Sequence, residues 1–201
     1  MSKVIYLTRH GQSQHNVNNK LGGNSNITLL GRSYSKKLFD FFDEKEINNL
    51  KLYTSELART QQTAKLFDDR IKKKLSFLNE INAGIFENES YEYIKENYPT
   101  EHNKRKKDKF NYRYPEGESY NDLNNRISKI FPIIDKDFKE DKNILIVSHN
   151  AVLRLIYGKL LNIPQKEIPH INIKLHCIYK FELINNTYKL TVLDFSPKIL
   201  V

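Results

Sequence analysis

The sequence predicts an α/β protein, in which a mostly parallel central sheet carries helices on both faces. Residues 4–7 and 144–147 are short apolar runs rich in β-branched side chains, a composition typical of buried parallel strands. Residues 52–55 form a third strand-like run. Amphipathic helical patterns lie between these runs, and this alternation favours the α/β class.

A helix is expected between the first and second of these strands along the chain. Thr28 can cap its start, and the helical pattern extends to about Glu44. The apolar side chains recur at helical spacing and predict a core-facing stripe of Leu30, Tyr34, Leu38, Phe41 and Phe42. The preceding residues, 11–27, form a polar loop, and a loop of this length in a compact domain is usually functional or disordered.

The middle of the chain is expected to contain several short elements. Ser55 can cap a helix that carries Arg59 in its first turn. A cation at this end of a helix is unfavourable unless an anion binds nearby, which favours a phosphate at Arg59. The elements that follow are a solvated lysine turn at 72–74, a short strand at 75–78, a short helix at 90–98 and a charged, aromatic crossing segment at 99–118.

The last third of the chain returns to the sheet and ends in a hairpin. Ser119 and Asp122 have the spacing of a capping box, and their helix should run to about Phe138 with a kink or interruption at Pro132. The remaining elements are a strand at 143–148, a helix at 151–161, and strands at 174–183 and 187–195 joined by the turn Asn185-Asn186.

Length and composition fit one α/β domain of 201 residues. Mean hydropathy is −0.64, and no run approaches the ~20 apolar residues of a membrane span. The chain enters a strand almost at once, which leaves no room for a signal peptide. Cys177 is the only cysteine, so an intramolecular disulfide is excluded and a reducing compartment is indicated. We therefore expect a cytoplasmic protein without a membrane partner.

The formal net charge of +9 has three interpretations. A basic face could bind nucleic acid. The charge could instead be spread over the solvated surface, because lysine abounds throughout the chain. Part of the charge could also serve a highly anionic small molecule, and the cluster at 104–107 with Lys109 is the candidate for that role.

Polar and cationic residues follow each of the three predicted parallel strands. Arg9 and His10 follow the first strand, His149 follows the run at 144–147, and Arg59 comes shortly after the run at 52–55. Open α/β sheets bind ligands at the carboxyl edge of their strands. We therefore expect these side chains to lie together in one site.

These motifs, in their order along the chain, resemble the histidine phosphatase superfamily, which has the phosphoglycerate mutase-like fold. The matching residues are Arg9-His10-Gly11, Ser55 with Arg59-Thr60, Glu80, and Ser148-His149. The resemblance covers nearly the whole chain. Within the superfamily, residues 78–84 and 112–120 are similar to the bisphosphatase half of 6-phosphofructo-2-kinase/fructose-2,6-bisphosphatase.

The resemblance implies the catalytic roles. His10 is the implied nucleophile, and the arginines beside it should lower its pKa and keep it unprotonated. Glu80 is the implied general acid, and then the base for the water that attacks the phosphohistidine. The implied ligands of the phosphoryl oxygens are Arg9, Arg59 and His149, with Asn16 as a further donor.

The resemblance also implies a set of substrate contacts and no cofactor. The matched positions are Asn16, Gly22, Tyr91, Arg105, Lys109, Tyr120, Asn150 and Arg154, and the segment at about 80–120 is expected to recognise the phosphosugar. Arg105 and Lys109 are four residues apart, so on a helix or regular turn they would face one side. No metal is expected, because the other histidines lack metal-ligand spacing: His15, His102, His170 and His176.

Two positions depart from the pattern of the family. Gln12 stands where the family commonly carries Glu, and Asn150 stands where the bisphosphatase typically has Gln. Asn is one methylene shorter, so a sugar contact is either lost or bridged by water. No kinase half is present in the 201 residues, and the sequence is expected to be a stand-alone phosphatase.

The function predicted from the resemblance is release of fructose 6-phosphate and phosphate from fructose 2,6-bisphosphate, a reaction of carbohydrate metabolism that regulates glycolysis. A broader sugar-phosphate phosphatase and a phosphoglycerate mutase are the alternative enzymes. A basic regulatory or nucleic-acid-binding protein on the same fold is the alternative outside enzymes. The His10, Arg59, Glu80 and His149 set argues against this last alternative, because a binding module has no need of a general acid.

Overall fold

The computed structural model describes residues 3–45 and 49–197, and in this part of the chain the strands form one six-stranded sheet. The sheet order is β3-β2-β4-β1-β5-β6. The strands are β1 (Lys3–Arg9), β2 (Leu50–Thr54), β3 (Lys72–Lys74), β4 (Asn143–Ser148), β5 (Cys177–Ile184) and β6 (Thr187–Asp194). Strands β1 to β4 pair in parallel, while β5 and β6 are joined antiparallel at one side. The predicted α/β class with a mostly parallel sheet is confirmed.

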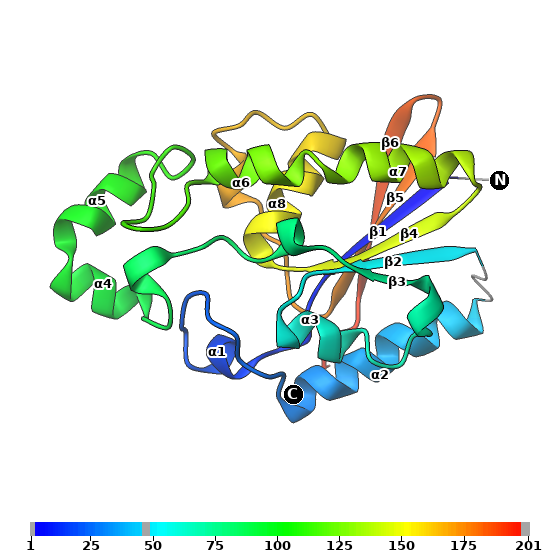
Figure 1. Cartoon of the computed structure of the whole chain (residues 1–201), viewed down its shortest axis with the longest axis horizontal. Helices are drawn as coiled ribbons and strands as arrows, with labels where there is room; N and C mark the ends of the chain where they lie inside the picture. The colour runs from blue at the N-terminus through cyan, green and yellow to red at the C-terminus, as the bar shows by residue number, and fades with distance from the viewer. Residues whose placement is uncertain (1–2, 46–48, 198–201) are drawn as a thin grey trace.

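Helices cover both faces of this sheet (Figure 1). One face carries α2 (Leu29–Glu44) and α3 (Ala58–Thr63). The other face carries α6 (Tyr120–Ile127), α7 (Ile130–Lys139) and α8 (Asn150–Leu160). Within the described residues, no helix is long and apolar enough to cross a membrane.

The core forms on both faces because side chains of a strand alternate between them. In β1, Ile5 and Leu7 pack with α6, α7 and α8, while Val4 and Tyr6 pack with α2. All four side chains are at most 5% exposed, so β1 is buried on both faces. This double burial explains why its sequence is a continuous apolar run.

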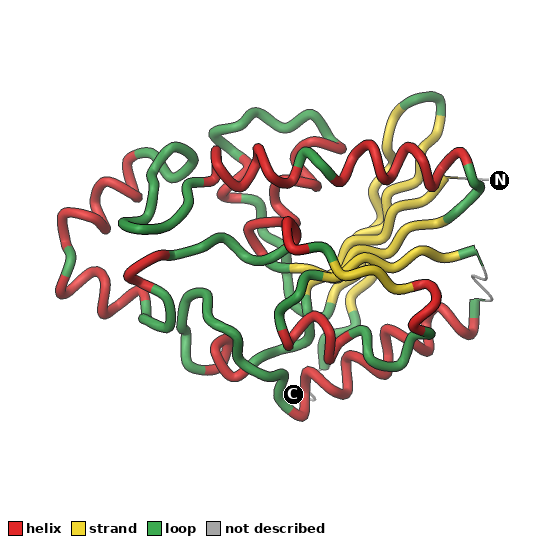
Figure 2. Tube along the Cα trace, in the orientation of Figure 1, coloured by secondary structure: helices red, strands yellow, loops and turns green. Residues whose placement is uncertain are grey.

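The strands β1 and β4 end side by side. Arg9 pairs with Ser148 in the parallel register, and the amide of His10 donates to the Ser148 carbonyl at 3.0 Å. The residues that follow the two strands therefore enter the same edge of the sheet, as predicted. Beyond this edge lie α1 (Gln14–Val17), α4 (Tyr91–Asn97) and α5 (Pro99–Lys107), linked mostly by loops (Figure 2).

Several predicted elements are confirmed together with their caps. Thr28 caps α2 through Gly31 N, and Ser119 forms a capping box with Asp122 at the start of α6. Asn185 and Asn186 have φ of 48° and 60°, the backbone that a two-residue hairpin turn between β5 and β6 requires.

The interruption predicted at Pro132 is also found. The helix breaks between α6 and α7, around Ser128 and Lys129. Residue 132 of a continuous helix would bond to the Ser128 carbonyl, but proline lacks the N–H and its ring clashes with that carbonyl.

The prediction for residues 72–78 was wrong. Lys72–Lys74 is not a turn but the edge strand β3, which pairs with β2, and residues 76–78 form a 3-10 turn, η2, rather than a strand. The lysine run hid the strand because apolar alternation is absent. Exposed lysines are nevertheless common on edge strands, where charge discourages pairing with another chain.

Other corrections concern helix ends. Leu57, not Ser55, is the N-cap of α3, and the Ser55 hydroxyl instead accepts from Leu57 N at 3.1 Å. Leu30 is 37% exposed and lies outside the core stripe of α2. The sequence reasoning missed two helices: α1, which begins with a capping box at Ser13, and α5, which begins with Pro99. Strand β5 starts at Cys177, three residues later than expected.

Candidate active site

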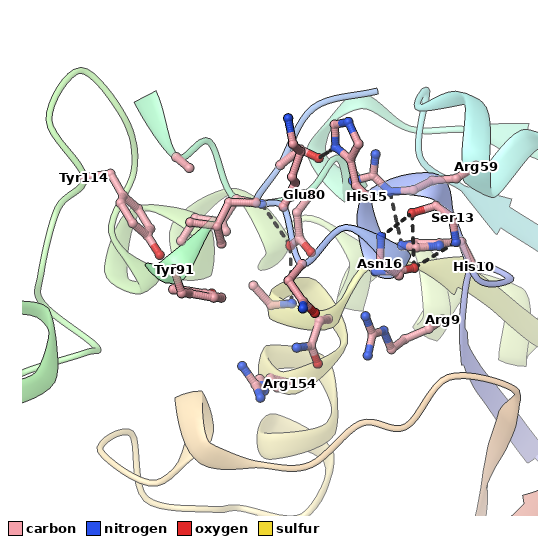
Figure 3. Close-up of a pocket in the computed structure, with 18 of the residues that line it drawn as sticks. Arg9, His10, Ser13, His15, Asn16, Arg59, Glu80, Tyr91, Tyr114 and Arg154 are labelled. Carbon is pink, nitrogen blue, oxygen red and sulfur yellow. Dashed lines mark hydrogen bonds between the residues drawn. The ribbon is translucent and has the colours of Figure 1, made fainter. Parts of the chain in front are cut away.

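A pocket opens at the carboxyl edge of β1 and β4 (Figure 3). All of the predicted site residues line it except His149 and Lys109. Those in the lining are Arg9, His10, Asn16, Gly22, Arg59, Glu80, Tyr91, Arg105, Tyr120, Asn150 and Arg154. The polar loop at 11–27 forms part of the wall, so its length is explained by the pocket.

The side chain of His10 is 3% exposed and is held as one tautomer. Its Nδ1 lies 2.8 Å from the Gly11 carbonyl oxygen, which can only accept, so Nδ1 carries the proton. Its Nε2 accepts from Arg59 Nε at 3.1 Å. The lone pair available for chemistry is therefore on Nε2.

His149 lies beneath the pocket lining and is 0% exposed. Its Nε2 lies 2.7 Å from Ser55 Oγ, and its Nδ1 accepts from Arg59 Nε at 3.2 Å. One Arg59 N–H thus faces both imidazoles, whose ring centroids are 5.3 Å apart. Arg59 Nη1 also donates to the Gly23 carbonyl at 2.7 Å, which ties the guanidinium to the loop.

The pocket floor keeps both imidazoles neutral. Burial, followed by the charges of Arg59 and Arg9, holds the pKa of His10 well below its usual 6.5. The pKa of His149 is lowered well below 6.5 by burial and then by Arg59. Burial also lowers the pKa of Arg9 to about 10, so this guanidinium still carries its charge at neutral pH.

These pKa shifts predict that the free energy of unfolding decreases as the pH falls below about 6.5. The unfolded chain protonates both histidines there, while the folded chain does not, and each histidine contributes up to about 1.4 kcal/mol per pH unit. Urea unfolding of the wild type and of His10→Asn at pH 7.5, 6.5 and 5.5 measures this slope. We expect the variant to have the shallower slope, and equal slopes would contradict a depressed pKa at His10.

Two backbone amides hold the carboxyl group of Glu80, which lines the pocket. Its Oε1 accepts from the backbone amides of Ile81 at 3.0 Å and Ala151 at 3.3 Å. Ala151 belongs to the first turn of α8, so the helix N-terminus helps to orient the carboxyl group. The carboxyl group is thus fixed at the wall of the pocket.

A second group of cations in the pocket, Arg105 and Arg154, is bonded to tyrosine hydroxyls rather than to His10. Arg105 donates to Tyr114 OH at 2.8 Å and to Tyr91 OH at 3.3 Å, and its guanidinium lies 4.9 Å from the Tyr91 ring centroid. Arg154 donates to Tyr120 OH at 3.1 Å. Arg154 Nε also donates to the Ile171 carbonyl at 2.6 Å. These hydroxyl and carbonyl partners orient the guanidinium groups without neutralising them.

Lys109 is placed differently from the prediction. Helix α5 ends at Lys107, so the helical spacing that would align Lys109 with Arg105 does not apply. Lys109 Nζ donates to the Pro169 carbonyl at 2.7 Å and lies outside the pocket lining. Burial, then the charges of Arg154 and Arg105, lower its pKa to about 8. Lys109 is therefore near the second group of cations but turned away from the pocket.

Some lining residues were missed from the sequence. They are Ser13, His15, Asn19, Lys20, Leu21, Ile81, Ala83, Tyr114 and Ala151. The capping box of Ser13 with Asn16 was a signal for the one-turn helix α1, which carries His15 and is capped by Ser13. His15, which was considered only as a metal ligand, lines the pocket, and its Nδ1 lies 3.1 Å from the Gly22 carbonyl.

The two departures from the family pattern have different surroundings. Gln12 Oε1 accepts from Thr28 Oγ1 at 2.9 Å and lies outside the pocket lining. Asn150 lines the pocket, and among the described residues its buried Oδ1 has no hydrogen-bond partner.

Across residues 3–45 and 49–197, no group of three or more His, Cys, Asp or Glu side chains could hold a metal ion.

The fold and this site define a class of protein. Two buried neutral imidazoles, convergent arginines and a carboxyl group at the end of a parallel sheet are the groups that phosphoryl transfer through histidine needs. The family description "Histidine phosphatase superfamily (branch 1)" matches residues 5–195. The chain belongs to this superfamily.

Curated relatives indicate a narrower group. The chain is 41% identical over 181 residues to a 6-phosphofructo-2-kinase/fructose-2,6-bisphosphatase of Caenorhabditis elegans, covering 90% of this chain and 39% of the relative. It is 41% identical over 182 residues to a fructose-2,6-bisphosphatase of Saccharomyces cerevisiae, with coverage of 90% and 39%. The chain thus spans about 39% of the length of these relatives.

Solved structures share the fold at lower identity. The alpha-ribazole phosphatase from Shigella flexneri has a TM-score of 0.82 and 24% identity, covering 95% of this chain and 96% of that one. A mycobacterial glucosyl-3-phosphoglycerate phosphatase has a TM-score of 0.80 and 19% identity, with coverage of 96% and 100%. The predicted phosphoglycerate mutase-like fold is confirmed.

Proposed function

We propose that this chain removes the 2-phosphate of fructose 2,6-bisphosphate and releases fructose 6-phosphate and phosphate. One observation carries the proposal: a single pocket holds four arginines, two beside His10 and two bonded to tyrosine hydroxyls. Arg9 and Arg59 lie beside His10, and Arg105 and Arg154 lie toward Tyr91 and Tyr120. Such a pocket suits a small molecule with two phosphates, which is the substrate class named for the curated relatives.

The first chemical step transfers the phosphoryl group to His10. The lone pair of Nε2 forms a bond to phosphorus, and the bond between phosphorus and the sugar C2 oxygen breaks. That oxygen takes a proton from the Glu80 carboxyl group, so fructose 6-phosphate leaves neutral at C2. Arg59 Nε–H, which donates to Nε2 in this structure, moves to a phosphoryl oxygen and stabilises its charge.

The second step returns His10 to its starting state. A water oxygen forms a bond to phosphorus and gives a proton to the Glu80 carboxylate. The phosphorus–nitrogen bond breaks, and its electrons return to Nε2. Arg9 and Arg59 contact the phosphoryl oxygens in both steps, with Asn16 as a further donor, so the positive environment stabilises both transition states. His149 joins them as the Nδ1–H tautomer, which becomes available when Arg59 Nε–H moves to a phosphoryl oxygen and Ser55 Oγ–H donates to His149 Nε2.

Recognition of the sugar and the 6-phosphate is assigned to the other end of the pocket. Arg105 and Arg154 bind the 6-phosphate, and Lys109 joins them by turning its amine from the Pro169 carbonyl to the phosphate. Gly22, Tyr91, Tyr120 and Asn150 contact the sugar or its phosphates. We further propose that residues 1–201 act as one domain in the cytoplasm, with residues 80–120 as the recognition segment.

The assignment predicts that Arg105→Ala lowers kcat/KM for fructose 2,6-bisphosphate by about 10–150-fold. One charge-assisted hydrogen bond to phosphate is worth about 1.5–3 kcal/mol, which corresponds to that range. Hydrolysis of a monophosphate ester should be nearly unchanged, because it has no second phosphate to bind. Steady-state kinetics with both substrates measure the contrast.

Lys106→Ala is the matched control, since Lys106 is an exposed cation on the same helix. It should leave both substrates unaffected. Equal losses of Arg105→Ala with both substrates would indicate a less selective sugar-phosphate phosphatase. Isomerisation of 3-phosphoglycerate would indicate a mutase. Salt-dependent binding of DNA or RNA without phosphatase activity would support the nucleic-acid alternative.

A further inference from the structure

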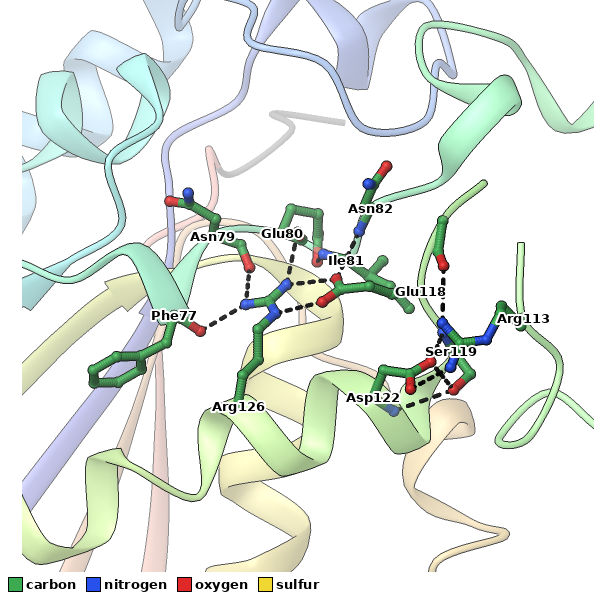
Figure 4. Close-up of polar contacts among 11 residues, drawn as sticks. Phe77, Asn79, Glu80, Ile81, Asn82, Arg113, Glu118, Ser119, Asp122 and Arg126 are labelled. Carbon is green, nitrogen blue, oxygen red and sulfur yellow. Dashed lines mark hydrogen bonds and ion pairs between the residues drawn. The ribbon is translucent and has the colours of Figure 1, made fainter. Parts of the chain in front are cut away.

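Arg126 lies outside the pocket lining but is bonded to the segment that carries Glu80 (Figure 4). It projects from α6, and its Nη1 donates to the carbonyls of Phe77 at 2.6 Å and Asn79 at 2.8 Å. Its Nη2 donates to the carbonyl of Glu80 itself at 3.0 Å. Three carbonyls within four consecutive residues therefore converge on one guanidinium.

The remaining donors of Arg126 bind Glu118. Arg126 Nε donates to Glu118 Oε1 at 2.7 Å, and Nη2 donates to Oε2 at 2.8 Å. Glu118 Oε2 also accepts from the Asn82 amide at 3.0 Å, and the Glu118 amide donates to the Asn82 carbonyl at 2.9 Å. Arg126 and Glu118 together hold the backbone from residue 77 to residue 82.

We propose that Arg126 is a positioning residue for general-acid catalysis, which fixes the backbone of residues 77–80 and thereby aims the Glu80 carboxyl group at the phosphoryl site. This inference rests on the acid role proposed above for Glu80. The carboxyl group has its own contacts with the amides of Ile81 and Ala151. Those contacts fix its rotamer, whereas Arg126 fixes the main chain from which it projects.

Only arginine can fill this position completely. The five N–H groups of the guanidinium lie in a rigid plane, and here they make five hydrogen bonds to three carbonyls and a carboxylate. Lysine offers three donors at one point and cannot bind Glu118 through two parallel bonds. A small displacement of a reacting group, of about 1 Å, can lower a rate by roughly 10²-fold.

The role predicts that Arg126→Met lowers kcat for a sugar phosphate by roughly 10²-fold with a smaller change in KM. Arg126→Lys should retain more activity than Arg126→Met. If Arg126 acts through Glu80, the same substitution should change kcat by less than about threefold in a Glu80→Gln background, because no acid is left to position. Stopped-flow and steady-state kinetics on the four combinations of wild type and variants measure this coupling.

Arg113→Met is the matched control. Arg113 precedes α6 and forms an ion pair with Asp122 of that helix at 2.5 Å. It also donates to the Gly117 carbonyl at 3.2 Å, and neither contact involves residues 77–80. We expect its kinetics to equal those of the wild type. If Arg126→Met does not fold, Arg126→Lys and Glu118→Gln provide the same comparison with smaller losses.

The leaving group separates positioning from a general loss of structure. Phosphorylation of His10 by p-nitrophenyl phosphate needs little acid, so Arg126→Met should slow it much less than phosphorylation by a sugar phosphate. Equal losses with both esters, or a full additional loss in the Glu80→Gln background, would overturn the positioning role. If Glu80→Gln alone has no effect on either ester, the acid role of Glu80 fails instead.

Discussion

Replacement of His10 with alanine is expected to reduce turnover on the order of 10⁶-fold, the scale at which covalent catalysts lose activity without their nucleophile. The loss should fall on kcat, because the arginines that bind phosphate remain. Substrate should therefore still bind to the variant. Isothermal titration calorimetry with fructose 2,6-bisphosphate would detect that binding.

A labelling experiment on the wild type locates the phosphoryl group. Wild-type protein quenched with labelled substrate should carry an alkali-stable, acid-labile label on the peptide with His10. The label should be on Nε2, because Nδ1–H is bonded to the Gly11 carbonyl at 2.8 Å. His102→Ala, a substitution on α5 away from the pocket, should label normally. Normal turnover by His10→Ala would exclude the phosphohistidine mechanism.

The position of this nucleophile could be predicted from sequence because it depends on one strand and its end. An apolar run predicts a buried strand, and parallel strands place their following residues on the same edge of the sheet. Register then brings His10 and His149 together, since Arg9 pairs with Ser148. The convergence of Arg9, Arg59 and both histidines follows from these local patterns and one topological rule.

The tautomers and depths of the histidines could not be predicted in this way. His149 lies below the lining and faces Ser55, because β4 continues the ladder up to Ser148 and the next residue turns inward. Which imidazole nitrogen is free depends on a carbonyl or hydroxyl contributed by the surrounding fold. A sequence pattern does not encode that geometry.

Other differences between the predictions and the structure arise because a local pattern does not show where an element ends or what lies beside it. Arg105 and Lys109 are four residues apart, but α5 ends between them, so the helical rule failed. Lys72–Lys74 forms a strand because β2 offers it a parallel edge, although its composition suggests solvent. Arg126 was missed because the carbonyls that it binds are 46–49 positions away.

Glu80→Gln is expected to slow turnover of fructose 2,6-bisphosphate by roughly 10²–10⁴-fold, the usual contribution of a general acid or base. Glutamine keeps the shape of the side chain. Its carbonyl oxygen can still accept from the amides of Ile81 and Ala151, which hold Glu80 Oε1 at 3.0 and 3.3 Å. The amide cannot give or accept the proton and cannot carry the carboxylate charge, so the change in rate reports on proton transfer rather than on misfolding.

The two chemical steps should respond differently to this substitution. p-Nitrophenolate leaves without protonation, so phosphorylation of His10 by p-nitrophenyl phosphate should be slowed far less than phosphorylation by fructose 2,6-bisphosphate. Dephosphorylation uses Glu80 as the base whichever ester supplied the phosphate, so it should be slowed equally with both substrates, and the phosphohistidine should accumulate on the variant with p-nitrophenyl phosphate. Rapid-quench measurement of labelled protein resolves both rates. Equal slowing of phosphorylation with the two esters would remove Glu80 from the acid role, and an unchanged dephosphorylation rate would remove it from the role of base.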